Sequence, residues 1–168
     1  AEKGGFEHFM IKEIHEQPRA VQDTINSAVH DGKIDLSEVG LTDDEIRKIS
    51  EVHIVACGSA YHVGVATQYV MEDLARIPVR VDLASEFRYR RPLIDKDALV
   101  IIVSQSGETA DSLAALREAK SMGIRTLGIV NVVGSTIARE ADNVFYTLAG
   151  PEIAVATTKA YSTQLIAG

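Results

Sequence analysis

The sequence has almost none of the cysteines that form disulfides in small secreted proteins or bind zinc. Its 168 residues include one cysteine, Cys57, and no tryptophan. A single cysteine excludes an internal disulfide and any zinc site built from several cysteines. This usage fits a reducing compartment, and we expect the protein to be cytoplasmic.

Long apolar runs and an excess of basic residues are also missing. No stretch approaches the roughly 20 apolar residues that cross a bilayer, and residues 1–5 lack the apolar core of a signal peptide. The 17 Lys and Arg residues are outnumbered by 24 Asp and Glu residues, which gives a net charge of −7. Neither a membrane nor a nucleic acid is therefore expected as a partner. A small anionic metabolite is compatible, because a few local donors can bind one phosphate.

The first thirty residues are predicted to be helical, with a further short helix before residue 50. Apolar residues recur at helical spacing through the first thirty positions, and Pro18 is expected to open a second helix there. A short polar helix is predicted after Thr42, with Glu45 completing a capping box.

From Val52 onward, short apolar runs alternate with amphipathic segments. The runs predicted as strands are Val52–Cys57, Val79–Leu83, Leu99–Ser104, Arg125–Val130 and Val144–Leu148. The segments predicted as helices are Tyr61–Ala75, Thr109–Met122 and Ser135–Glu140. This alternation indicates a five-stranded, mainly parallel sheet in a three-layer αβα sandwich, an α/β fold of the flavodoxin or Rossmann-like kind. Ligands bind beyond the carboxyl ends of such strands, so we expect a site at the loops after Cys57, Val103 and Val130.

The segment Ser104–Thr109 follows the third predicted strand and precedes a helix. It offers hydroxyls at Ser104, Ser106 and Thr109, an amide at Gln105, and a glycine that permits a tight turn. Hydroxyls and backbone N–H groups at a helix N-terminus can hold a phosphate without a lysine, because the helix dipole favours negative charge. A helix cap would explain one hydroxyl. We therefore favour a phosphate site.

Two other strand-to-helix segments share this design. The turn after Cys57 contains Gly58 and Ser59, and the segment 150–159 joins small residues to hydroxyls before a helix. Neither the dinucleotide fingerprint G-x-G-x-x-G nor a P-loop occurs, so we expect no nucleotide cofactor.

Together these segments resemble the sugar isomerase (SIS) domain as it occurs in glutamine–fructose-6-phosphate aminotransferases. The resemblance rests on motifs in the family's order: K-G-G-F-E-H-F-M-I-K-E-I-H-E-Q-P, A-C-G-S-A-Y-H, A-S-E-F-R-Y-R, S-Q-S-G-E-T-A-D and P-E-I-A-V-A-T-T-K-A-Y. It implies that residues 1–50 are a helical lead-in that follows a glutaminase domain, and that residues 51–168 are an SIS domain whose last helix is cut short. We therefore expect the chain to be a piece of a longer protein.

The resemblance also implies roles for single residues. The loop residues Ser104, Gln105, Ser106 and Thr109 would bind the phosphate. The residues that would contact the sugar are Cys57, Gly58, Ser59, Val155, Ala156 and Thr157. Ala60 stands where the family has a phosphate-binding serine, which removes a hydrogen bond worth about 0.5–1.5 kcal/mol.

The family's reaction converts fructose 6-phosphate and glutamine to glucosamine 6-phosphate and glutamate without a metal or a cofactor. Its acid, base and Schiff-base residues lie in a second SIS domain and a C-terminal tail, so this chain should bind the sugar phosphate and not turn it over alone. The family's isomerase modules dimerise. A homodimer is therefore expected, with the basic segment Arg88–Arg91 at an interface or on a solvated helix face.

Two other functions remain open: a sugar-phosphate-sensing regulator, and a relative of amino-sugar deaminases or deglycases. Other reactive side chains have plainer interpretations. Cys57 could pair with His62 as a nucleophile, but a cysteine that ends a buried strand is more often structural. His53 shows no metal-ligand spacing. For Lys159 we expect a structural or electrostatic role rather than a Schiff base.

Overall fold

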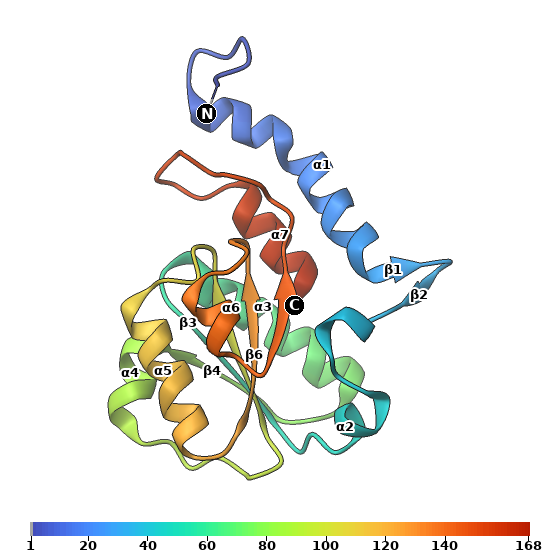
Figure 1. Ribbon diagram of the computed structural model, residues 1–168, viewed down its shortest axis with the longest axis vertical. Coiled ribbons are helices and arrows are strands. Elements are labelled where there is room, and N and C mark those ends of the chain that lie inside the picture. Colours follow the sequence, from blue (N-terminus) through green and yellow to red (C-terminus); the bar gives the residue numbers. More distant parts are fainter. Residues whose placement is uncertain (1) are drawn as a thin grey trace.

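A computed structural model describes residues 2–168, and at its centre lies a parallel sheet (Figure 1). The strands are β3 (Val52–Ala56), β4 (Val79–Leu83), β5 (Leu99–Ser104), β6 (Arg125–Val130) and β7 (Asn143–Tyr146). They lie in the order β4-β3-β5-β6-β7, and every neighbouring pair is parallel. The predicted α/β fold is confirmed. The bounds of β4, β5 and β6 match the prediction exactly.

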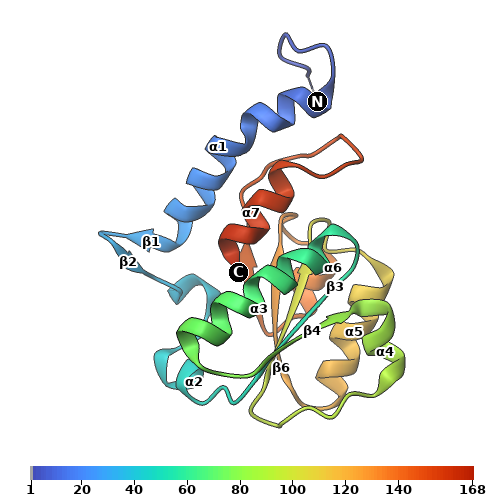
Figure 2. The same cartoon turned by 180° about the vertical axis from the view of Figure 1, so that it is seen from behind.

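Helices cover both faces of this sheet. They are α3 (Ser59–Ala75), α4 (Ala84–Arg90), α5 (Ala110–Ser121), α6 (Thr136–Glu140) and α7 (Lys159–Ala167). Side chains alternate along β5, so that Val100 and Ile102 pack in the cluster with α4, α5 and α6, whereas Ile101 and Val103 pack on the side of α3 and α7. Figure 2 shows α3 lying across the second face with α7 beside it. Within residues 2–168, none of the helices combines the length and the apolar character needed to cross a bilayer.

Pro18 does not open a second helix, so that prediction was wrong. Helix α1 (Phe9–Ala28) runs unbroken through it. Proline has no N–H for the carbonyl four residues back, which here is the carbonyl of Ile14. The side-chain amide of Gln17 donates to that carbonyl instead, at 3.2 Å. Ser162 of α7 in turn donates to Gln17, at 2.5 Å. The Gln17 amide therefore replaces the missing backbone donor, and its hydrogen bond with α7 holds it in place, so α1 stays continuous.

An ion pair and a hydrogen bond connect the rest of the lead-in, residues 29–50, to the sheet. It comprises β1 (Val29–His30), β2 (Lys33–Ile34), the 3₁₀ turn η1 (Ser37–Val39) and α2 (Asp43–Arg47). The predicted capping box of Thr42 and Glu45 is confirmed. Glu45 also pairs with Arg125 of β6 at 2.6 Å, and Asn143 of β7 donates to the carbonyl of Val39.

His53 lies in the middle of the sheet and is fully buried. Its Nε2 lies 3.0 Å from the Glu51 carboxylate. Its Nδ1 lies 3.9 Å from Asp82, too far for a hydrogen bond but close enough for electrostatic attraction. Burial lowers the pKa of His53, but Asp82 and Glu51 together raise it by more, so the net pKa lies above the ordinary value. The side chain is packed and paired.

This pairing predicts a pH-dependent contribution to stability. Because the folded-state pKa of His53 is raised, its contribution is fully present below about pH 6.5 and is lost as the pH rises through the folded-state pKa. In His53→Gln, the melting temperature should fall less between about pH 6 and about pH 9 than in the parent. Thermal unfolding at both pH values measures this. An unchanged pH dependence in the variant would show that His53 is not the titrating group.

Candidate functional site

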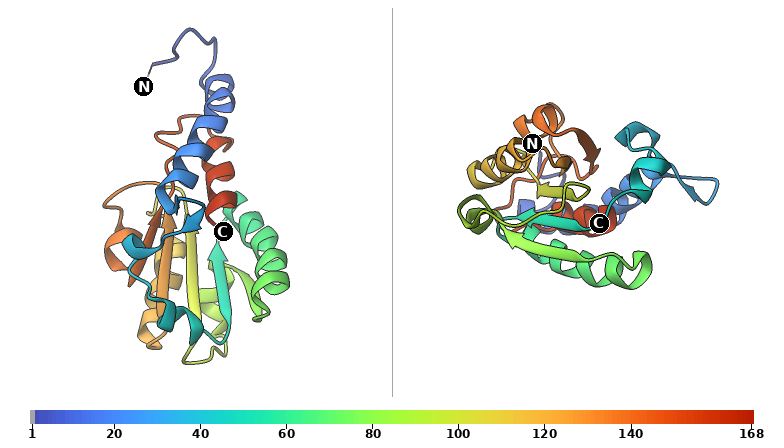
Figure 3. Two further views of the ribbon diagram at one scale, coloured as in Figure 1. Left: turned by 90° about the vertical axis from the view of Figure 1, so that its right-hand side faces the viewer. Right: turned by 90° about the horizontal axis from the view of Figure 1, so that it is seen from below.

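The carboxyl ends of the strands point toward α1 and α7 (Figure 3). There a cavity of about 300 Å³ opens between three segments: the turn after β3, the loop after β5 and the loop before α7. The predicted site residues that line it are Cys57, Ser59, Ser104, Gln105, Ser106, Thr109, Val155, Ala156 and Thr157. Gly58 does not line the cavity. Its φ of 59° lets the chain turn from β3 into α3.

Internal hydrogen bonds shape the loop after β5. The N–H of Gly107 donates to the Ser104 hydroxyl at 3.1 Å, and the N–H of Glu108 donates to the Ser106 hydroxyl at 3.2 Å. The hydroxyls of Ser104 and Thr109 lie 3.4 Å apart. A hydroxyl has one donor and two acceptor positions. Since backbone N–H groups occupy acceptor positions on both serines, Ser106 keeps its O–H to donate, and the Ser104–Thr109 pair keeps one O–H beyond the bond between its two hydroxyls. Such a loop suits a ligand that only accepts hydrogen bonds.

The turn between β6 and α6, together with the first residues of α6, supports this loop from outside the cavity. The N–H of Asn131 donates to the carbonyl of Gln105, and the N–H of Ile137 donates to that of Gly107. The loop after Val130 is the third strand-end loop at which a ligand was expected. None of its residues lines the cavity, and its contact with the site is this support of the loop after β5.

Glu108 also faces this supporting turn. Its carboxylate accepts the N–H of Thr136 at 2.7 Å, and that bond lowers the pKa of the Glu108 carboxyl. Glu108 is not among the cavity-lining residues. The Glu108 carboxylate, the one negative charge in the loop, thus accepts a hydrogen bond at the start of α6 and does not face an anion in the cavity.

Two carboxylates fix the loop before α7. In the described part of the chain, no backbone–backbone hydrogen bond is made by residues 150–157. Glu152 instead accepts the N–H groups of Thr158 and Ala160. Glu13 of α1, only 2% exposed, accepts the N–H of Ile153 at 2.5 Å and that of Ala154 at 3.2 Å. The lead-in helix therefore holds the segment that carries Val155, Ala156 and Thr157.

Lys159, at the start of α7, is buried and lies outside the cavity lining. Its Nζ contacts Glu16 of α1 at 2.7 Å and lowers the pKa of that carboxyl. This pairing agrees with the electrostatic role expected from the sequence.

The sequence did not reveal two polar residues that line the cavity, Ser112 of α5 and Gln164 of α7. Ser112 could have been found, because it lies three residues after Thr109 and hence on the same face of a helix. Gln164 carried no comparable signal, since only tertiary packing brings α7 over the strand ends.

Comparison with known proteins shows the family to which the chain belongs. The model of the SIS domain matches residues 45–168. The chain belongs to the SIS domain family. Within that family it is similar to the glutamine–fructose-6-phosphate aminotransferase (isomerising) of Clostridium tetani, with 61% identity over 168 residues. That match covers 99% of this chain and 28% of the relative, so this SIS chain spans under a third of the relative's length.

Solved structures agree with this assignment of the SIS fold. The C-terminal domain of the aminotransferase from Francisella tularensis superposes with a TM-score of 0.94 at 43% identity, covering 99% of this chain and 47% of that one. A glucosamine-6-phosphate deaminase from Thermotoga maritima gives a TM-score of 0.74 at 24% identity, covering 95% of this chain and 48% of that one. The second likeness shows a shared fold only.

Proposed function

We propose that this SIS domain binds the phosphate group of fructose 6-phosphate or glucosamine 6-phosphate as part of an isomerising glutamine–fructose-6-phosphate aminotransferase. The observation that carries the proposal is the Ser104–Thr109 loop, whose serine oxygens accept backbone N–H groups and so present O–H donors to the cavity. A phosphate dianion only accepts hydrogen bonds, which matches these donors. The names of the similar proteins supply the identity of the sugar phosphate.

The phosphate would be bound without a formal positive charge. No Lys, Arg or His is among the residues that line the cavity. The remaining attraction comes from the N-terminus of α5, where free N–H groups and the helix dipole favour an anion. Ala60 also lines the cavity and contributes no hydroxyl. We therefore expect modest affinity.

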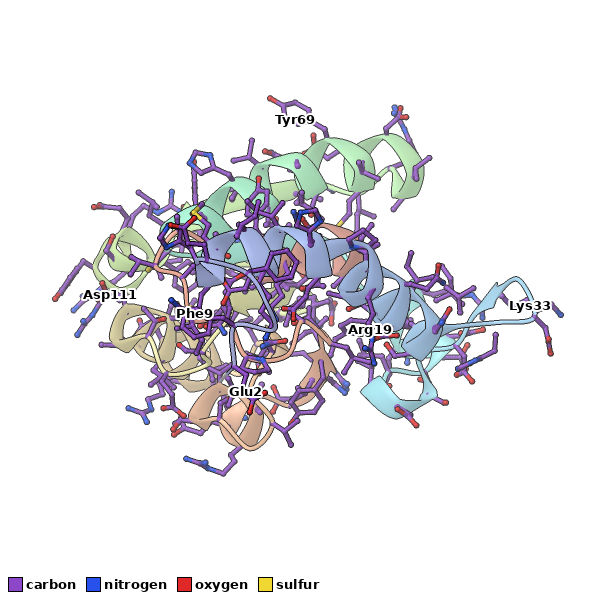
Figure 4. The ribbon with its side chains drawn as sticks, turned by 90° about the horizontal axis from the view of Figure 1, so that it is seen from above. Glu2, Phe9, Arg19, Lys33, Tyr69 and Asp111 are labelled. Atoms are coloured by element: carbon purple, nitrogen blue, oxygen red, sulfur yellow. The ribbon has the colours of Figure 1, made fainter. Side chains whose placement is uncertain are left out.

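We infer that the other parts of the reaction lie outside this chain. Similar aminotransferases are more than three times as long, which leaves room for a glutaminase domain, a second SIS domain and the acid and base residues. A homodimer is part of the same proposal. Exposed apolar side chains on α3, among them Tyr69 at 70% exposure and Leu74, form a surface that another domain or subunit would cover (Figure 4). The regulator and deaminase alternatives have no observation in their favour here.

A ligand-induced shift in melting temperature tests the phosphate site. Glucosamine 6-phosphate should raise the melting temperature of the parent chain, and free fructose at equal concentration should not. In the double variant Ser104→Ala, Ser106→Ala the shift should disappear, because both O–H donors are lost. Ser121→Ala, which removes an exposed hydroxyl from the far end of α5, is the control and should shift like the parent. A double variant that responds like the parent would contradict the assignment.

A further inference from the structure

Two polar side chains lie deep in the cavity and take no part in the Ser104–Thr109 loop. Ser112 is 1% exposed and Gln164 is 4% exposed, and they reach the same cavity from α5 and α7. The Ser112 hydroxyl is buried without a hydrogen-bond partner. Within residues 2–168, no side-chain hydrogen bond is made by the amide of Gln164, whose backbone carbonyl accepts the N–H of Gly168.

The orientation of Ser112 is unusual for a buried helical hydroxyl. Such groups normally donate to a backbone carbonyl three or four residues back. Thr24 does so in α1, with Ala20 as the acceptor at 2.8 Å, and Thr163 does so in α7, with Ala160 as the acceptor at 2.9 Å. Ser112 forms no such bond and faces the cavity instead. Because a buried polar group without a partner costs free energy, a partner is expected from whatever fills the cavity.

The chemistry of the two side chains indicates what that partner is. Ser112 and Gln164 can each both donate and accept a hydrogen bond, whereas a phosphate dianion only accepts. A sugar hydroxyl has the same double capacity as these side chains. The cavity therefore combines donors suited to a phosphate on the loop after β5 with donor–acceptor groups suited to a polyhydroxylated chain on α5 and α7.

We propose that Ser112 and Gln164 bind a hydroxyl group of the sugar and so let the cavity distinguish a phosphorylated sugar from inorganic phosphate. This inference rests on the proposed phosphate site and adds specificity residues to it. Binding would give the Ser112 hydroxyl the partner that it lacks. Inorganic phosphate, held by the Ser104–Thr109 loop alone, would leave both side chains unused.

Titration calorimetry with two ligands tests this. For Ser112→Ala, and separately for Gln164→Met, the dissociation constant for glucosamine 6-phosphate should rise by roughly 10-fold, as expected for a lost buried hydrogen bond. The constant for inorganic phosphate should change by less than about twofold, since its donors are untouched. The melting temperature of free Ser112→Ala should not fall, because the hydroxyl has no partner to lose.

Thr163→Val is the matched control. It removes a buried hydroxyl next to Gln164 that is bonded within α7 and does not line the cavity, so both affinities should stay as in the parent. The inference is overturned if both variants bind glucosamine 6-phosphate as the parent does, or if the two ligands weaken equally. If Ser112→Ala does not fold, Gln164→Met decides by the same comparison. A parent chain that binds neither ligand would instead overturn the proposed function, and this inference with it.

Discussion

Replacing Gly107 with alanine is expected to lower the melting temperature by about 6–12 °C and to abolish sugar-phosphate binding. Gly107 has a φ of 66°, and an added Cβ would lie 2.1 Å from the Ser135 hydroxyl oxygen and 2.6 Å from the Ser135 Cβ. The left-handed backbone costs about 1–2 kcal/mol for alanine, and crowding a packed contact costs about 1–3 kcal/mol. A total of about 3 kcal/mol corresponds to that shift for a domain of this size.

Two further variants separate backbone strain from crowding. Gly123 has a φ of 74° and nothing within 4 Å of an added Cβ, so Gly123→Ala should show the backbone cost alone. Adding Ser135→Gly to Gly107→Ala should recover the crowding part, because it removes both atoms that the new methyl group would meet. If Gly107→Ala melts no lower than Gly123→Ala, the close packing of the loop against Ser135 is refuted.

Replacing Glu13 with alanine should lower the melting temperature by about 4–8 °C and weaken the binding of glucosamine 6-phosphate. The change leaves the partly buried N–H groups of Ile153 and Ala154 without their shared carboxylate. Hydrogen bonds to a charged group contribute about 1.5–3 kcal/mol, so we expect a loss of about 2 kcal/mol, which gives this shift. The loop that carries Val155–Thr157 should exchange its amide hydrogens faster, which hydrogen–deuterium exchange measures.

Asp23→Asn is the control for Glu13. Asp23 lies on the same helix, but its carboxylate is half exposed and, among residues 2–168, pairs only with Arg19. Exposed pairs contribute about 0–1 kcal/mol, so this variant should melt and bind nearly as the parent does. Glu13→Gln keeps one acceptor oxygen and should fall between the two. Normal exchange in the loop of Glu13→Ala would mean that other contacts hold it.

The strands were predictable because their signal is local. In β5 every side chain is buried, and an unbroken apolar run is what a central parallel strand requires. The candidate loop was equally visible, since Ser104, Ser106 and Thr109 are close in sequence and follow that strand. At Pro18 the rule that proline ends a helix failed, because a side chain replaced the missing backbone donor. That compensation has no sequence signature.

What the sequence could not show is how distant segments meet at the cavity. Glu13 and Ile153 are 140 residues apart, and no pattern links a carboxylate in one helix to two amides in a remote loop. Gln164 could not be predicted for the same reason, because its position at the cavity depends on where α7 packs. Predictions about such residues need the packing of helices, which depends on the summed fit of many side chains.

Helix α1 contacts the loop before α7 at the carboxyl ends of the strands. This contact affects which fragments of the protein would keep the cavity. A gene fragment that begins at residue 45, where the family match starts, would encode the whole parallel sheet and all the cavity-lining residues. It would omit Glu13, the anchor of the loop before α7. Such a fragment would keep the sheet and lose the contact that holds one side of the cavity. We therefore expect the shape of the cavity to depend on residues that lie before the segment matched by the family.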